Sequence, residues 1–257
     1  MMKARRPLVA GNWKMNGARA NVGALLEGIV AGARALDRTE IVVCPPSVFL
    51  EMAATYLSGT KIGLGAQNVS EYAAGAYTGE ISGDMLRDLG CRFAIVGHSE
   101  RRRLFGESDA QVAAKAVQAQ ACDLIPIICV GEDWDERSAG RTEVVVSRQL
   151  QAVFKNEKAV DLSHAVIAYE PVWAIGTGKT ASPEQAQDVH QFLRGLVADS
   201  NPALAPGIRI LYGGSMTAEN AKALIAMPDI DGGLVGGASM KAESFVAICA
   251  AANALAG

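Results

Sequence analysis

Short apolar runs alternate with longer amphipathic segments along the whole chain. The apolar runs are continuous rather than alternating in polarity, which is typical of strands covered on both faces. Strands are predicted at residues 7–11, 40–44, 62–66, 93–96, 124–130, 166–169, 208–212 and 233–235. Helices are predicted between them, at residues 17–36, 47–57, 82–89, 108–121, 137–155, 182–199, 217–226 and 242–254.

Capping signals support several of these helix boundaries. Ser108 and Ser182 each precede a glutamine by three residues, the spacing of a capping box, and Pro183 suits the first helical position. Gly90 follows the segment 82–89 and provides a stop. About eight strand and helix units predict an α/β fold, a closed (β/α)8 barrel, with an open doubly wound sheet as the alternative.

Length and composition agree with one large domain. Barrels of this kind often contain near 250 residues, and this chain has 257, of which 50% are apolar. We find no linker, low-complexity segment or charge block, so a single domain is expected over residues 1–257. A net charge of -3 gives no general attraction to nucleic acid or to an anionic membrane, and no apolar run reaches the length of a bilayer span.

The five cysteines, at positions 44, 91, 122, 129 and 249, contain no C-x-x-C pair. An odd count without that pair argues against a disulfide framework and against a thiolate metal site. The apolar stretch after the basic amino terminus is too short for the core of a signal peptide. We therefore expect a cytoplasmic protein in a reducing compartment.

Polar residues that directly follow strands meet at one face of a parallel barrel. Asn12 and Lys14 follow the first predicted strand, His98 and Glu100 follow the fourth, and Glu170 follows the sixth. An amide, an ammonium group, an imidazole and a carboxylate would then converge on one pocket. These residues are the candidate catalytic groups.

Glu170 stands between a buried strand and a segment rich in apolar residues, Pro171 to Ile175. Such neighbours raise the pKa of a carboxyl group toward the value of a general base, whereas the alternative is a solvated turn residue. Residues 171–180 are stiff at one end and glycine-containing at the other, a composition suited to a lid. The Gly178-Lys179-Thr180 string is no nucleotide-binding loop, because Trp173 occupies the place of the required glycine.

The other candidates also have simpler interpretations. Lys14 would balance negative charge on an oxygen atom, or lie on the surface with its stem against apolar neighbours. His98 would be an acid–base group or a structural histidine; its spacing to Glu100 occurs in zinc deaminases, but Cys129 lacks the second cysteine of that motif. Ser99 lacks the glycine that a nucleophile elbow needs, so neither metal nor serine chemistry is expected.

Glycine-rich strings lie at the last two predicted strands, at residues 213–215 and 232–237. Barrels commonly hold a phosphate there on backbone amides, and the alternative is that the glycines only permit tight turns. The two strings together with Gly176 favour an anion site. The residues thus indicate an enzyme for a small phosphorylated carbonyl compound, without naming the substrate.

The connection from Gln67 to Glu80 is longer than a barrel requires and carries Tyr72 and Tyr77. It is predicted either as a mobile surface loop or as a subunit contact anchored by its tyrosines. The run Arg101-Arg102-Arg103 is either solvated or ion-paired across an interface, to Glu80 or to Glu107.

Several strings, taken in order over essentially the whole chain, resemble those of the triosephosphate isomerase family. They are Gly11-Asn12-Trp13-Lys14-Met15-Asn16, Gly65-Ala66-Gln67-Asn68, Val96-Gly97-His98-Ser99-Glu100-Arg101-Arg102, Cys129-Val130-Gly131-Glu132, Tyr169-Glu170-Pro171-Val172-Trp173-Ala174-Ile175-Gly176-Thr177-Gly178, Tyr212-Gly213-Gly214-Ser215 and Gly233-Leu234-Val235-Gly236-Gly237-Ala238-Ser239. The resemblance implies a single-domain (β/α)8 TIM barrel enzyme of glycolysis and gluconeogenesis. Its reaction would be the interconversion of dihydroxyacetone phosphate and D-glyceraldehyde 3-phosphate through an enediolate.

The resemblance also implies a role for each candidate. Glu170 would move a proton between C1 and C2, and His98 would act as a neutral imidazole that polarises the carbonyl, which is the pattern known for this family. Lys14 and Asn12 would bind substrate and stabilise its negative charge, with Glu100 as a supporting carboxylate. The phosphate would be held by amides of Gly176, Ser215, Gly236 and Gly237, under a lid that excludes water.

A homodimer without cofactor or metal is implied as well. Its contacts would come from the long loop and its surroundings, at Tyr77, Thr78, Glu80 and Arg101. Two other functions compete with this one: another phosphate-binding barrel enzyme, and a catalytically silent homologue that only binds. The presence of Lys14, His98 and Glu170 argues against the silent homologue.

Overall fold

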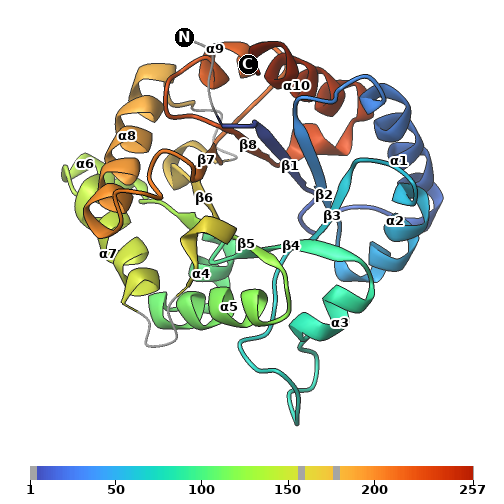
Figure 1. The fold of residues 1–257 in the computed structure, drawn as a ribbon, viewed down its shortest axis with the longest axis horizontal. Helices are drawn as coiled ribbons and strands as arrows, with labels where there is room; N and C mark the ends of the chain where they lie inside the picture. The colour runs from blue at the N-terminus through green and yellow to red at the C-terminus, as the bar shows by residue number, and fades with distance from the viewer. Residues whose placement is uncertain (1–4, 156–159, 176–179, 257) are drawn as a thin grey trace.

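Eight parallel strands close into a barrel in sequential order from β1 to β8 (Figure 1). The computed structural model describes residues 5–155, 160–175 and 180–256. The strands are β1 (Leu8–Asn12), β2 (Glu40–Cys44), β3 (Gly63–Ala66), β4 (Cys91–Val96), β5 (Ile125–Val130), β6 (Val166–Tyr169), β7 (Arg209–Tyr212) and β8 (Gly232–Val235). The predicted (β/α)8 barrel is confirmed, and the doubly wound sheet is wrong, because β1 pairs with both β2 and β8.

The strands are buried on both faces, which explains their continuous apolar sequence. Alternate residues point into the barrel and form one apolar cluster, made of Leu8, Ala10, Val42, Cys44, Phe93, Ile95, Ile127, Cys129, Val166, Ala168, Leu211 and Leu234. The residues between them, such as Val9 and Val43, pack outward in a second cluster with the helices. The barrel interior is therefore a packed core, and only its ends are open for chemistry.

Helices surround the barrel, as Figure 1 shows. They are α1 (Arg19–Ala33), α2 (Leu50–Leu57), α3 (Gly83–Asp88), α4 (Ser99–Phe105), α5 (Asp109–Ala121), α6 (Trp134–Ser138), α7 (Thr142–Phe154), α8 (Pro183–Ser200), α9 (Ala221–Ile225) and α10 (Ala242–Leu255). Short 3-10 turns also occur: η1 (Ser47–Phe49), η2 (Leu162–His164), η3 (Val172–Ala174) and η4 (Gly237–Met240). None of the helices in the described part of the chain is both long and apolar enough to cross a membrane.

Most predicted helices are confirmed, with two differences. The segment 137–155 is not one helix, because Gly140 adopts a φ of 67° and separates α6 from α7. The helix α4 was not predicted, since its run of arginines carries no apolar periodicity. The capping boxes at Ser108 and Ser182 are both present.

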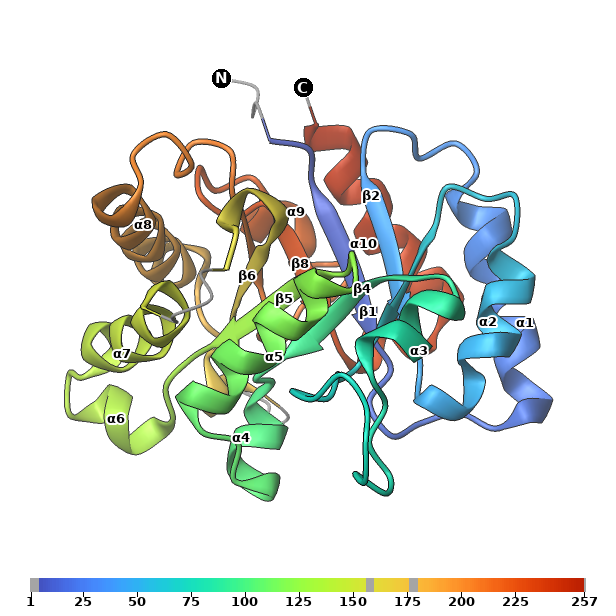
Figure 2. The same ribbon diagram turned by 60° about the horizontal axis from the view of Figure 1, so that its bottom comes forward.

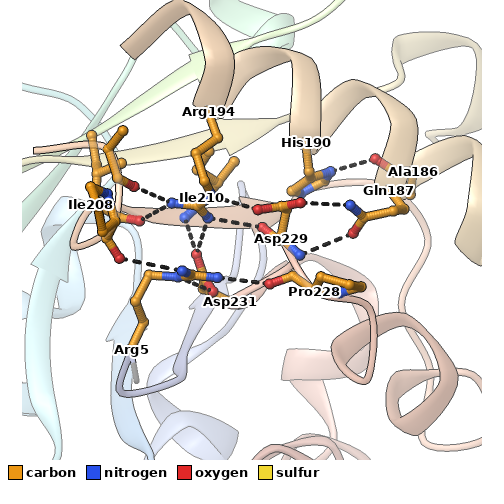
Figure 3. A network of polar contacts seen from close by, with 12 residues as sticks. Arg5, Ala186, Gln187, His190, Arg194, Ile208, Ile210, Pro228, Asp229 and Asp231 are labelled. Atoms are coloured by element: carbon orange, nitrogen blue, oxygen red, sulfur yellow. Dashed lines mark hydrogen bonds and ion pairs between the residues drawn. The ribbon is translucent and has the colours of Figure 1, made fainter. Parts of the chain in front are cut away.

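An ionic network fastens the end of the barrel where β7 and β8 begin (Figure 3). The guanidinium of Arg194, on α8, donates hydrogen bonds to Asp229 at 2.6 Å and to Asp231 at 2.8 Å, and also to the carbonyls of Ala205 and Ile208. Arg5 donates to the other oxygen of Asp231 at 2.7 Å. These ion pairs connect α8 to the amino-terminal ends of β7 and β8. They lie at the end of the barrel opposite the carboxyl ends of the strands.

Candidate active site

The strand ends bring the predicted catalytic residues to one face of the barrel. Asn12 is the last residue of β1, His98 follows β4, and Glu170 follows β6. With Lys14 they line a cavity of about 310 Å³. Glu100 lines an adjoining cavity, together with Asn12, Lys14 and His98.

Glu170 and His98 are in direct contact inside this cavity. Oε1 of Glu170 lies 2.9 Å from Nε2 of His98, and Oε2 accepts a hydrogen bond of 2.8 Å from the backbone N–H of Ser99. The two side chains are almost fully enclosed, with Glu170 2% and His98 5% exposed. A carboxylate and an imidazole thus share a desolvated space, where proton transfer and electrostatic effects are strong.

The partners of the imidazole define its tautomer. Nδ1 of His98 accepts a hydrogen bond of 3.2 Å from the backbone N–H of Glu100, at the start of α4. An acceptor nitrogen carries no proton, so in the neutral ring the proton lies on Nε2. The Nε2–H group therefore points toward the carboxylate of Glu170, in the interior of the site.

The sequence-based expectation of a raised Glu170 pKa is wrong for this arrangement. Burial does raise the pKa of the Glu170 carboxyl, but His98, the N–H of Ser99 and the charge of Lys14 outweigh it, and the pKa is lowered. Burial likewise lowers the pKa of His98, and the neighbouring Glu170 carboxylate reverses this, so that the pKa of His98 is raised. Burial is the largest single contribution to each pKa, and the contact between the two residues is the main contribution that opposes it.

Lys14 reaches the same space from β1. Its Nζ lies 2.7 Å from Oε1 of Glu100, and its backbone N–H donates to Oδ1 of Asn12 at 3.0 Å. The backbone of Lys14 has a φ of 52°, which is rare for a residue with a side chain. The predicted cation, amide and supporting carboxylate are thus brought together, and the surface interpretation of Lys14 does not apply.

The glycine strings form the other wall of the cavity, through Gly213, Gly214, Ser215, Gly236 and Gly237. At Gly213 a β-carbon would lie 2.8 Å from Cγ of Glu170, and at Gly214 it would collide with the hydroxyl of Tyr212. Both glycines therefore allow close approach of neighbouring groups. Gly176, the remaining predicted phosphate ligand, lies outside the described residues.

Glu132 is a buried carboxylate for which the sequence pattern predicts no role, and it contacts Trp173 at the start of the segment 171–180. Its side chain is fully buried, and Oε1 accepts hydrogen bonds from Trp173 at 2.9 Å and from the hydroxyl of Tyr169 at 3.1 Å. Arg137 donates to the same oxygen at 3.1 Å and lies over the Trp173 ring. The only signal in the sequence is that Glu132 stands shortly after the end of a strand, as the catalytic candidates do.

The long loop projects away from the barrel on its own (Figure 2). Tyr72 and Tyr77 stack face to face, with ring centroids 4.0 Å apart, and Tyr77, Thr78 and Glu80 are exposed. Arg101 pairs with Glu107 of its own chain, and its predicted contact across a subunit interface stays a prediction. The solvated interpretation of the arginine run is wrong for Arg102, which pairs with Asp109 at 2.6 Å.

Across residues 5–155, 160–175 and 180–256, no group of three or more histidine, cysteine, aspartate or glutamate side chains is placed to hold a metal ion. The cavity is lined by a carboxylate, an imidazole, an ammonium group, the Asn12 amide and glycine-rich backbone. Such a set can take a proton from a carbon next to a carbonyl and stabilise the resulting oxyanion.

Known proteins are similar in sequence to this chain over almost its whole length. The family model described as triosephosphate isomerase matches residues 7–252. The chain is 58% identical to a triosephosphate isomerase of Thiobacillus denitrificans, over 96% of this chain and 99% of that protein. It is 57% identical to one of Nitrosococcus oceani, over 97% and 100%, and 54% identical to one of Methylococcus capsulatus, over 95% and 98%. The chain belongs to the triosephosphate isomerase family.

Proposed function

We propose that this enzyme interconverts dihydroxyacetone phosphate and D-glyceraldehyde 3-phosphate through an enediolate. The contact between the Glu170 carboxylate and the Nε2–H of His98 supports this proposal most directly, because it places a base beside a hydrogen-bond donor in one buried cavity. The family match over residues 7–252 makes another phosphate-binding barrel enzyme or a silent homologue the weaker choice.

Glu170 is the proposed base. In the described arrangement its two oxygens are occupied by His98 and by the N–H of Ser99, which lower its pKa. When the carboxylate turns from these two donors toward a substrate carbon, their lowering contributions are lost, while burial and the weaker effect of the Lys14 charge remain. Its pKa then rises, so the group becomes a stronger base at the moment when it meets the proton.

His98 is the proposed electrophile. Its raised pKa depends mainly on the carboxylate of Glu170. Departure of that carboxylate leaves burial, the Lys14 charge and the Glu100 N–H, which favour the neutral ring, against the smaller opposing effect of the Glu100 carboxylate. The Nε2–H group is then free to donate to the substrate oxygens. Lys14 and Asn12 would stabilise the negative charge on those oxygens, and Glu100 would orient the Lys14 ammonium group through their 2.7 Å contact.

The phosphate is proposed to bind on the glycine side of the cavity. Ser215, Gly236 and Gly237 line it there, and Gly176 would add an amide from the lid. Gly236 lies next to the Lys14 stem, since a β-carbon there would be 3.5 Å from Cε of Lys14. Neutral amides and one cation would thus hold an anionic substrate in a protein with a net charge of -3.

A homodimer in the cytoplasm is also proposed. The exposed tyrosine stack at Tyr72 and Tyr77 supports a subunit contact, because large apolar groups on a projecting loop are typical anchors of an interface. The five cysteines are unbonded and buried, which agrees with a reducing compartment.

The test is proton exchange at C1 of dihydroxyacetone phosphate in deuterated water, followed by NMR. We expect the native protein to exchange the proton and to form D-glyceraldehyde 3-phosphate, and a Glu170→Gln variant to lose both. A folded native protein without exchange would overturn the isomerase proposal. Full exchange by the Glu170→Gln variant would remove Glu170 from the role of base.

A further inference from the structure

The backbone of Lys14 is held in an unusual conformation. Its φ of 52° lies in the left-handed region, where a β-carbon crowds the following carbonyl group. Among the described residues with a side chain, only Asp123 shares a positive φ. Conformations of this kind persist where surrounding contacts enforce them, and they cluster at functional sites.

The contacts that enforce it come from two amides. Asn12 accepts the N–H of Lys14 through Oδ1 at 3.0 Å. Gln67 donates from one atom, Nε2, to the carbonyl of Lys14 at 2.9 Å and to the carbonyl of Cys44 at 2.8 Å. Both polar groups of the Lys14 backbone are therefore fixed by side chains.

Gln67 occupies a position from which it reaches three strand ends. It follows the last residue of β3, Cys44 is the last residue of β2, and Lys14 stands two residues after β1. The carbonyl of Cys44 also accepts the N–H of Trp13 at 3.1 Å, next to Lys14 in sequence. The amide of Gln67 thus bridges the turn after β1 and the last residue of β2.

We propose that Gln67 is a positioning residue for Lys14, which holds the strained backbone so that the ammonium group stays at the site. Gln67 lines the same cavity as Lys14, His98 and Glu100, so it is close to the groups that it would position. The inference rests on the proposed function, because it assumes that Lys14 stabilises substrate charge. The competing view is that Gln67 only stabilises the barrel rim.

Replacement of the amide separates these views. In Gln67→Met the side chain keeps its length but donates no hydrogen bond, so the Lys14 carbonyl loses this donor and the backbone relaxes toward negative φ. The Cys44 carbonyl keeps the Trp13 N–H, so the pairing of β1 with β2 remains. We expect kcat/KM for the triose phosphates to fall roughly tenfold to 10²-fold, as for a catalytic group that is displaced by about 1 Å.

A matched control exists in the same chain. Nε2 of Gln120 also donates to two backbone carbonyls, those of Asp161 at 2.7 Å and His164 at 3.1 Å, ahead of β6 and away from the site. Gln120→Met removes the same kind of contact, and we expect kcat/KM to stay within about twofold of the native value, because the carbonyls that lose their donor, those of Asp161 and His164, touch no residue of the site. Thermal unfolding of both variants shows whether their stability losses are comparable.

The decisive measurement is a double-mutant cycle with Lys14→Met. If Gln67 acts through Lys14, Gln67→Met should lower kcat/KM in the native background and change it less than about twofold in the Lys14→Met background. Equal losses in both backgrounds, or a Gln67→Met variant as active as Gln120→Met, would overturn the inference. A native protein without isomerase activity would instead overturn the proposed function. If Gln67→Met does not fold, Gln67→Glu replaces it in the cycle, because a carboxylate keeps the shape but donates no hydrogen bond.

Discussion

Nε2 of His98 lies 2.9 Å from Oε1 of Glu170, and this contact joins the two buried acid–base groups of the site. Each residue stabilises the charge of the other, which lowers the pKa of the carboxyl group and raises that of the imidazole. The same carboxylate is held by the N–H of Ser99 at 2.8 Å. A substrate must therefore replace two hydrogen bonds of Glu170 before the carboxylate can act as a base.

The position of this carboxylate leads to a first prediction. Glu170→Asp shortens the side chain by one methylene group and withdraws the carboxylate by about 1 Å, so kcat should fall on the order of 10²-fold while the fold is unchanged. Steady-state kinetics and circular dichroism test this together. An unchanged kcat would contradict the assignment of Glu170 as the base.

The exposed stack on the long loop leads to a second prediction. Replacing Tyr77 and Thr78 by glycine removes the ring that packs on Tyr72 and is expected to give monomers of low activity. Sedimentation velocity reports the mass, and the same samples are assayed. A fully active monomer would rule out a contribution of the interface to the site.

A buried histidine leads to a prediction about pH and stability. Burial lowers the pKa of His190 from 6.5 to about 4. Because the folded pKa is below the unfolded one, the unfolded chain binds more protons between these values, and stability is lost as pH falls through this interval. From pH 7 to pH 5 this one group should lower the free energy of unfolding by about 2 kcal/mol.

The comparison for this prediction is His190→Phe, which keeps an aromatic ring against Tyr169 but removes the titrating group. Denaturant unfolding at pH 7 and pH 5 should show a smaller decrease for the variant than for the native protein. The same decrease in both proteins would show that carboxyl groups elsewhere account for the pH dependence.

The network at the amino ends of β7 and β8 leads to a fourth prediction. Arg194→Met leaves the fully buried Asp231 with Arg5 as its cation, and Asp229 loses its ionic partner. The free energy of unfolding should fall by about 3 kcal/mol, as for a broken buried ion pair. Chemical denaturation measures this loss, and kcat/KM of the folded variant should be unchanged because the network is on the opposite face.

Arg148→Met is the control for this variant. Arg148 pairs with Asp109 at 2.9 Å but its side chain is 60% exposed. Exposed pairs contribute at most about 1 kcal/mol, so little change is expected. A loss as large as that of Arg194→Met would mean that burial does not decide the strength of these pairs.

The sequence by itself predicted the architecture of this protein and proposed a set of candidate catalytic groups. Continuous apolar runs are typical of strands packed on both faces, and about eight repeats of strand and helix favoured a barrel over a doubly wound sheet. Because all strands run the same way, the residues after them, such as Asn12, His98 and Glu170, had to meet at one end. These inferences depend only on periodicity and order along the chain.

The tertiary structure alone decided which groups touch and how they are charged. The expected rise in the Glu170 pKa failed because it considered only the apolar neighbours in sequence, whereas His98 and Ser99 arrive from 71 positions or more away. The support of Lys14 by Gln67, and of Trp173 by Glu132, likewise joins residues from different strand ends. Electrostatic and hydrogen-bond effects depend on distance in space, which local sequence patterns do not encode.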